Sequence, residues 1–307
     1  MTSQAHAWRS DKKNKNKAIY GTDDRFDMHQ TNERIRKWGT ALGHWTDVMK
    51  TNIDGEELEL IFPNMIEEYN LCKDEKFSKQ PTSAVACTGF LVAPDLMLTA
   101  GHCMVESGEV KNKATDKCQD FDWVFDYAIN KKGDNPLKGK SSSIVRCKEV
   151  IYGIHEKKGK NRKDYALIRL SKKMEGRHSF QPGNLEELYE GKRIAMLGFP
   201  SGLPLKYASD AFIKKMNPEK VYFEGTVDAV GGNSGSPVIT RKGELLGILV
   251  RGNNDFVIDK KKKCKRWNIC NSEGDKCSDG KQDSGYDAGM HIQKITPHIL
   301  KLINENN

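Results

Sequence analysis

The sequence has no run of about 18 apolar residues, so we expect no membrane span. Residues 1–17 also lack the apolar stretch of a signal peptide. They are rich in Lys, Asn and Ser, and we interpret them as a disordered leader or propeptide that a cut after Lys17 removes, leaving Ala18 as the first residue. The remaining length can bury the core of one compact unit with two subdomains, or of two small domains.

The sequence also lacks the closely spaced cysteine pairs that bind zinc, because the nearest cysteines, Cys264, Cys270 and Cys277, have five or six residues between them. Its 8 cysteines are even in number and fit four disulfides. We favour disulfides over a metal site, expect no metal and no cofactor, and infer an oxidising compartment. Away from the motifs described below, the one pairing that we favour is Cys118 with Cys147.

The net charge of +8 is concentrated in Lys12–Lys17 and in Lys260–Lys263, which Lys265 and Arg266 follow. Such clusters can bind anionic polymers or membrane surfaces, but solvated loops are the simpler interpretation. No aromatic interleaving or nucleic-acid motif accompanies them. We therefore expect no nucleic-acid partner, and we expect the protein to be a monomer.

Short apolar segments separated by polar turns follow one another from about residue 83, which is typical of an all-β sandwich or barrel. Before them, apolar residues that step by three or four across 33–50 predict a helix or a helical turn. At the other end, Thr296 as N-cap and Pro297 at the first helical position predict a terminal helix over 297–305.

A histidine stands in the segment TAGHC, where the strand-like LMLT runs into His102 and Cys103. Cys87 lies sixteen positions before Cys103, in the preceding strand. Two antiparallel strands joined by a tight turn can bring these cysteines within bonding range, and the bond would hold the strand end that presents His102. The alternative interpretation is a satisfied histidine at a strand end.

A serine stands in the segment GNSGSP, where glycines flank Asn233 and Ser234 and permit a sharp turn. Such a turn exposes the hydroxyl and points backbone N–H groups at one spot, which is what acyl transfer needs. An ordinary Gly/Ser/Asn turn is the alternative. Asp164 opens the strand-like DYALIRL, which is a weak signal alone because surface aspartates commonly begin strands.

The chain order His102, Asp164, Ser234 is the one that chymotrypsin-type enzymes use. With these motifs the chain resembles the trypsin-like serine peptidases over roughly residues 18 to 305, and GNSGSP and AIYGTDDR resemble their bacterial glutamyl-endopeptidase-like branch. The resemblance implies Ser234 as nucleophile, His102 as general base, Asp164 as its partner, and the N–H groups of Gly232 and Ser234 as the oxyanion hole. Asn233 replaces the acid that pairs with a new N-terminus in animal relatives, so that salt bridge is not expected here.

The implied fold is all-β, with two antiparallel β-barrels of the chymotrypsin-like type and the active site between them. Residues 18–82 would be an N-terminal extension packing on the barrels, and 83–180 the first barrel with His102 and Asp164. Residues 181–307 would form the second barrel with Ser234, followed by the C-terminal helix.

The resemblance also suggests residues that bind substrate. Asp228 lies six positions before Ser234, at the base of the pocket in trypsin-like enzymes, where a buried carboxylate would favour Lys or Arg. An aspartate that binds backbone amides is the alternative. Glutamyl endopeptidases carry a histidine at the position of Leu249, so glutamate specificity would depend on Arg251, which precedes Gly252.

These patterns together predict a secreted, extracellular serine endopeptidase whose partners are protein or peptide substrates. Three alternatives stay open: a catalytically inactive peptidase-like binding protein, an intracellular quality-control protease with reduced cysteines, and an esterase with the same triad. A fluorophosphonate probe at Ser234, a count of free thiols, and a comparison of ester with amide substrates distinguish them.

Overall fold

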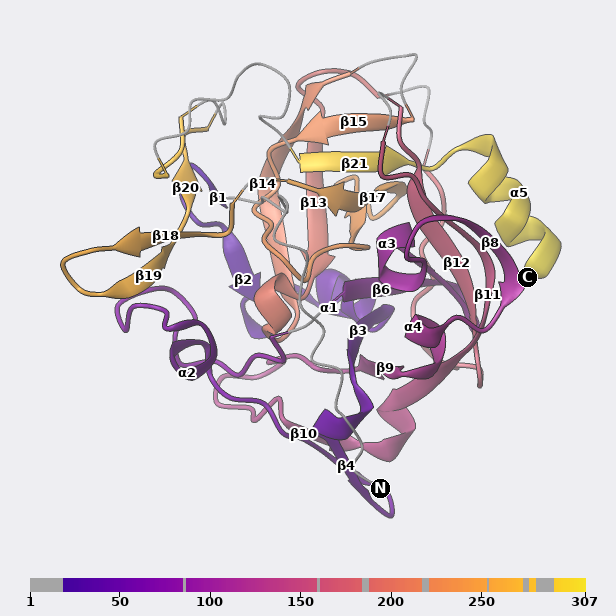
Figure 1. The fold of residues 1–307 in the computed structure, drawn as a ribbon, viewed down its shortest axis with the longest axis horizontal. Helices are drawn as coiled ribbons and strands as arrows, with labels where there is room; N and C mark the ends of the chain where they lie inside the picture. Colours follow the sequence, from indigo (N-terminus) through magenta and orange to yellow (C-terminus); the bar gives the residue numbers. More distant parts are fainter. Residues whose placement is uncertain are drawn as a thin grey trace.

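The computed structural model describes residues 19–84, 87–158, 161–183, 188–216, 221–252, 254–272, 276–279 and 290–307. Strands dominate these segments, and helices are few and short (Figure 1). None of the helices within the described segments has the length and apolar character needed to cross a membrane. The expected leader 1–17 and the expected first residue, Ala18, lie outside the described residues.

Six antiparallel strands close the first barrel, in the order β12-β7-β6-β3-β9-β11, and β11 pairs with β12 to complete the ring. In chain order they are β3 (Leu42–Asp47), β6 (Cys87–Ala93), β7 (Leu96–Thr99), β9 (Phe121–Phe125), β11 (Ile144–His155) and β12 (Asp164–Leu170). A further strand, β8 (Gly108–Lys113), extends β11 on the outside.

Six more antiparallel strands close the second barrel, in the order β13-β16-β17-β21-β15-β14, with β14 returning to β13. In chain order they are β13 (Arg193–Gly198), β14 (Lys206–Lys215), β15 (Tyr222–Gly225), β16 (Pro237–Ile239), β17 (Leu245–Arg251) and β21 (Met290–Lys294). A short strand, β2 (Arg25–Asp27), adds to β14. Closure of both sheets leaves no open edge in either ring and confirms the predicted two-barrel fold.

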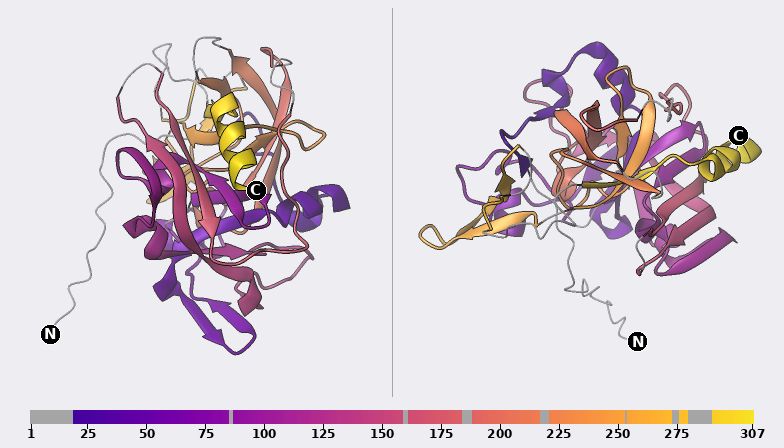
Figure 2. Two further views of the ribbon diagram at one scale, coloured as in Figure 1. Left: turned by 90° about the vertical axis from the view of Figure 1, so that its right-hand side faces the viewer. Right: turned by 90° about the horizontal axis from the view of Figure 1, so that it is seen from above.

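The predicted C-terminal helix is present as α5 (Pro297–Asn306). Thr296 caps it, because its side chain accepts a hydrogen bond from the backbone N–H of Ile299. The chain enters α5 from the second barrel, yet the helix packs on the first (Figure 2), where Arg169 of β12 donates to the carbonyl oxygen of Asn306. The helix therefore connects the two barrels.

The predicted boundary at residue 83 between extension and first barrel is wrong, since β3 is an integral strand of that barrel. The helix expected over 33–50 is also shorter: α1 spans only Glu33–Gly39, and β3 follows it. Leu42 and Trp45 belong to a strand that is buried on both faces, as its burial pattern shows. Such a strand shows no in–out alternation, and the spacing of its apolar residues is easily mistaken for a helical period.

Smaller elements surround the barrels. Three strands form a peripheral sheet, β4 (Thr51–Asp54), β5 (Glu57–Leu60) and β10 (Lys138–Lys140), and β1 (Ile19–Tyr20) pairs in parallel with β20 (Ile269–Cys270). Besides short 3-10 helices, the other elements among the described residues are α2 (Met65–Tyr69), α3 (Gly101–Met104), α4 (Asp116–Gln119) and the hairpin strands β18 (Phe256–Asp259) and β19 (Cys264–Trp267).

All the cysteines form disulfides, so none offers a thiolate to a metal. The structure joins Cys87 to Cys103 and Cys118 to Cys147, and both pairings are as predicted. The other two disulfides are Cys72–Cys264 and Cys270–Cys277. The first of these connects the segment after α2 with the β18–β19 hairpin across a sequence separation of 192 residues.

Candidate active site

His102 lies in the single turn of α3, directly after β7 ends at Thr99. Gly101 permits this turn, because a Cβ atom there would collide with the backbone carbonyl of Ile154 in β11. The Cys87–Cys103 disulfide then ties the turn to the start of β6. Three neighbouring strands thus fix the backbone that presents His102.

Asp164 is the first residue of β12, and both of its carboxylate oxygens face His102. One accepts a hydrogen bond from the backbone N–H of His102 at 2.8 Å, and the other lies 2.9 Å from Nδ1 of the ring. A carboxylate oxygen is an acceptor, so Nδ1 carries the proton and Nε2 is left as the basic nitrogen. This is the tautomer that a general base acting through Nε2 requires.

The Asp164 carboxylate is 2% exposed, and its ionisation reflects two opposed effects. Burial raises its pKa, but the charge and hydrogen bonds of His102 outweigh burial and hold the pKa below its usual value. The carboxylate is therefore negative at neutral pH and can stabilise a protonated imidazole.

Gln293 of β21 reaches this pair from the second barrel, and sequence reasoning missed it. Its Oε1 accepts the backbone N–H of Asp164 at 3.3 Å, while its Nε2 donates to the carbonyl oxygens of Val221 and Lys294. The side chain is 1% exposed. No local signal marks this residue, because a glutamine in a strand is ordinary until the strand's position in the fold is known.

The turn that carries Ser234 depends on two glycines in the left-handed region, Gly232 at φ +89° and Gly235 at φ +91°. A Cβ atom on Gly235 would collide with the carbonyl oxygen of Thr88 in β6. The carbonyl oxygen of Ser234 accepts the backbone N–H of Thr88 at 2.7 Å and lies 3.8 Å from Sγ of Cys103. The serine turn of the second barrel therefore packs against the residue next to His102.

Some backbone N–H groups of this turn donate hydrogen bonds to acceptors within the protein. Gly231 donates to Asp255 at 3.0 Å and Asn233 to the carbonyl oxygen of Val230 at 3.1 Å. Among the described residues, no protein acceptor faces the N–H of Gly232. The side-chain amide of Asn233 is fully buried and has no hydrogen-bond partner in the described part of the chain.

The proposed pocket residues occupy different environments. Both oxygens of Asp228 accept backbone N–H groups, from Tyr20 at 2.7 Å and from Asp24 at 2.9 Å. Burial, and then the charge of Asp24, raise the pKa of Asp228 well above its usual value. This is the structural alternative named above, and it argues against a counterion for a substrate lysine or arginine.

Leu249 is fully buried in the core of the second barrel, and its expected contact with substrate stays a prediction. Its carbonyl oxygen accepts the N–H of Gly235 at 2.7 Å. Arg251 ends β17 half-buried, with its guanidinium 5.8 Å from the centre of the Tyr222 ring, and Gly252 follows it, also half-buried.

Two closed barrels with a His–Asp pair on the first and a glycine-flanked serine turn on the second define the serine-peptidase architecture. Residues 87–248 match the trypsin-like peptidase domain, which is more than half of the chain, and the protein belongs to that family of serine proteases. The predicted resemblance to trypsin-like serine peptidases is thereby confirmed.

Among solved structures, the fold is similar to that of a Glu endopeptidase in complex with MPD, with a TM-score of 0.50 and 15% sequence identity over 94% of this chain and 98% of that one. It is more distantly similar to an inactive form of the protease Rv3671c of M. tuberculosis, with a TM-score of 0.43 and 12% identity over 89% and 92% of the two chains. At such identities the similarity concerns the fold alone.

Proposed function

We propose that this protein is a secreted serine endopeptidase in which Ser234, His102 and Asp164 act as one catalytic unit. The observation that carries the proposal is the Asp164 carboxylate, which holds both the ring and the backbone of His102. Membership of the trypsin-like peptidases supports it as well. The four disulfides agree with an oxidising, extracellular location.

In the proposed mechanism the Ser234 hydroxyl attacks the carbonyl carbon of the scissile bond while Nε2 of His102 takes its proton. Asp164 stabilises the imidazolium that forms, and the N–H groups of Gly232 and Ser234 bind the oxyanion. The tetrahedral intermediate collapses, and His102 returns the proton to the departing amine. Water then attacks the acyl-enzyme by the same route, releasing the acid and restoring Ser234.

We further propose that Asp228 anchors the N-terminal segment and does not select basic substrates. Its two oxygens are occupied by the N–H groups of Tyr20 and Asp24, and burial favours its neutral form. A peptide library tests this directly: we expect no preference for cleavage after Lys or Arg. A preference of tenfold or more for Lys and Arg would contradict this role of Asp228.

A fluorophosphonate probe tests the catalytic assignment. We expect the wild-type protein to be labelled at Ser234 and to cleave an unfolded protein substrate, and Ser234→Ala to lose both properties while keeping its melting temperature. Ser236→Ala is the matched control, because Ser236 lies two positions further on in the same turn and is fully buried. An unlabelled and inactive wild type would identify a binding protein with a peptidase fold instead.

A further inference from the structure

The β18–β19 hairpin projects from the second barrel beside α2, and its turn is Lys260–Lys263 (Figures 1 and 2). We call residues 256–267 the basic hairpin. It follows the short segment after β17, the strand that ends at Arg251. A lysine-rich turn of this kind is ordinarily a solvated loop, and the contacts of the basic hairpin decide whether it is one here.

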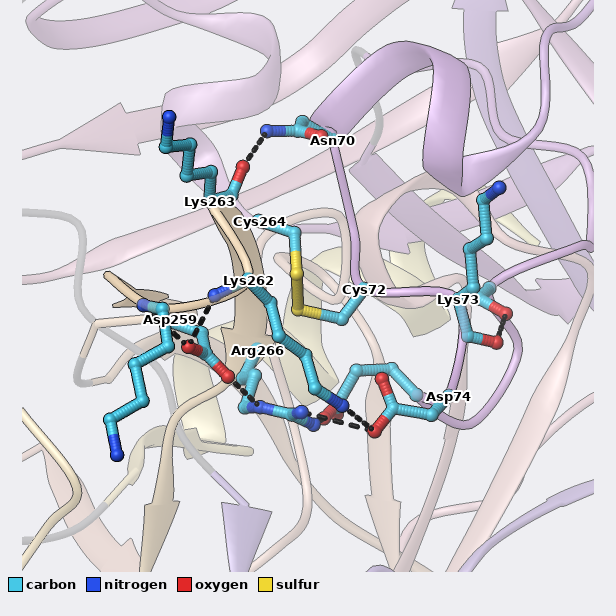
Figure 3. The surroundings of a disulfide bond; sticks show 12 residues. Asn70, Cys72, Lys73, Asp74, Asp259, Lys262, Lys263, Cys264 and Arg266 are labelled. Atoms are coloured by element: carbon cyan, nitrogen blue, oxygen red, sulfur yellow. Dashed lines mark hydrogen bonds and ion pairs between the residues drawn. A yellow bond between two sulfur atoms is a disulfide. The ribbon is translucent and has the colours of Figure 1, made fainter.

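The basic hairpin is fixed to the segment after α2 by several bonds (Figure 3). The Cys72–Cys264 disulfide joins the two, and Asn70 donates through its side chain to the carbonyl oxygen of Lys263 at 3.0 Å. The backbone N–H of Lys265 donates to Asn70, and that of Cys72 donates to Lys265, both at 2.8 Å. A mobile surface loop would have no such bonds. These bonds fix the backbone at the end of the lysine turn, and with it the place where the lysines are presented.

The carboxylates around the basic hairpin are already paired with cations. Arg266 contacts Asp74, Glu75 and Asp259, and Lys262 also binds Asp74 (Figure 3). The remaining ammonium groups of the turn are exposed, and no described carboxylate pairs with them: Lys260, Lys261 and Lys263. Their mutual repulsion is an electrostatic cost that an anionic partner would relieve.

A pocket of about 440 Å³ lies where the basic hairpin meets the segment after α2. Its size is in the range that holds side chains or small ligands. The apolar residues Ile66 and Leu71 line it together with the basic Lys73 and Lys262; the other lining residues are Asn70, Cys72, Asp74 and Cys264. An apolar side chain can therefore insert here while neighbouring carboxylates contact the lysines.

The base of the basic hairpin adjoins the serine turn. Asp255, immediately before β18, accepts the N–H of Gly231, which precedes the oxyanion residue Gly232. The four residues of β18 rise about 3.3 Å each, which places the lysine turn roughly 13 Å beyond this contact. An extended peptide covers that distance with about four residues. A polypeptide bound at Ser234 can therefore reach the lysines when it extends about four residues along the basic hairpin.

We propose that the basic hairpin and its pocket bind an acidic segment of the polypeptide substrate, about four to eight residues from the scissile bond. This site rests on the proposed function for its link to cleavage, but binding to it can be measured without catalysis. The recognised segment carries several Asp or Glu residues and one apolar side chain. Such docking would select substrates by the sequence of a segment that lies away from the scissile bond.

Binding is tested on Ser234→Ala protein, so that no peptide is cut. The probe is a fluorescein-labelled peptide of Glu residues around one Leu, followed by anisotropy and compared with its Gln counterpart. We expect the triple variant K260A/K261A/K263A to bind the Glu peptide roughly tenfold more weakly, because three surface ion pairs are lost. We also expect binding to weaken as salt rises from about 0.05 M to 0.3 M.

The matched control is the triple variant K131A/K132A/K138A, which removes the same charge from exposed lysines of strand β10 and the loop before it. We expect less than a twofold change with it. Equal losses in both triple variants would show a net-charge effect and overturn the proposal. Equal binding of the Glu and Gln peptides would overturn it too, as would tight binding to heparin or phosphatidylserine vesicles with none to the Glu peptide. Failure of the wild type to cleave proteins would refute the proposed function alone.

Discussion

Replacing Asp164 with asparagine keeps the size and shape of the side chain but removes its negative charge and one hydrogen-bond acceptor. Asparagine keeps an oxygen that can accept the backbone N–H of His102, now bonded at 2.8 Å. Its amide nitrogen then faces Nδ1 of the imidazole, where the carboxylate oxygen lies at 2.9 Å. Because an amide NH2 only donates, Nδ1 has to accept, and the ring proton moves to Nε2. His102 can no longer take the proton of Ser234.

The expected loss is large because two effects add. The basic nitrogen is blocked by the wrong tautomer, and the imidazolium that forms in the transition state loses its buried counterion. For a triad of this kind the loss in kcat is roughly 10⁴-fold, or about 5 kcal/mol of transition-state stabilisation. KM should change little, because Asp164 is 2% exposed and does not contact substrate.

The measurement is kcat and KM on a peptide substrate found in the library, with the rate of fluorophosphonate labelling as a second readout. Thermal unfolding provides the control, and we expect the melting temperature of Asp164→Asn to stay within a few degrees of the wild type. A folded Asp164→Asn protein with at least a tenth of the wild-type kcat would refute the assigned role. A catalytic unit built on another carboxylate would then have to be sought.

Three further changes test other parts of the structure. His44 is buried between Tyr127 and Phe199, and burial lowers its pKa to about 3. In the unfolded state the pKa is about 6.5, so below that pH only the unfolded protein gains a proton at His44, and the free energy of unfolding falls. His44→Phe removes this effect, so between pH 7 and pH 5 the variant should lose about 2 kcal/mol less unfolding free energy than the wild type, measured by urea unfolding. Gly235→Ala should destabilise by about 2–4 kcal/mol and abolish labelling, whereas Gly191→Ala, with φ +88° but open space around it, should cost about 1 kcal/mol. Gln293→Met should lower kcat about fivefold without changing KM, and an equal rise in KM would contradict a positioning role.

Local motifs predicted more of this protein than long-range arrangement did. TAGHC and GNSGSP are informative because the constraint lies within a few residues: Gly101 and Gly235 stand where a Cβ atom would collide with backbone. The repeated short strands were enough for the barrel class, since their number and spacing follow from turn residues. The Cys87–Cys103 bond follows from the same hairpin that presents His102.

Features that depend on contacts far apart in the sequence could not be predicted in this way. Gln293 reaches Asp164 across 129 positions, and the disulfide from Cys72 to Cys264 spans 192. The sequence pattern predicts helix where strand β3 lies, because burial on both faces removes the alternation of apolar and polar residues that marks a strand. In each case the residue type is ordinary and only its partner gives it a role.

Asp228 occupies the sequence position that lies at the base of the specificity pocket in trypsin-like enzymes, but its carboxylate has different partners here. The residue six before the serine is buried, as the resemblance implied, but its oxygens bind the N-terminal segment at Tyr20 and Asp24. That segment also provides β1, which pairs with β20, and β2, which pairs with β14. A maturation cut inside 19–27 would therefore remove a hydrogen-bond donor to Asp228, or one of the strands β1 and β2. A cut after Lys17 would spare them all, so the contacts of Asp228 set the latest position at which processing leaves this fold intact.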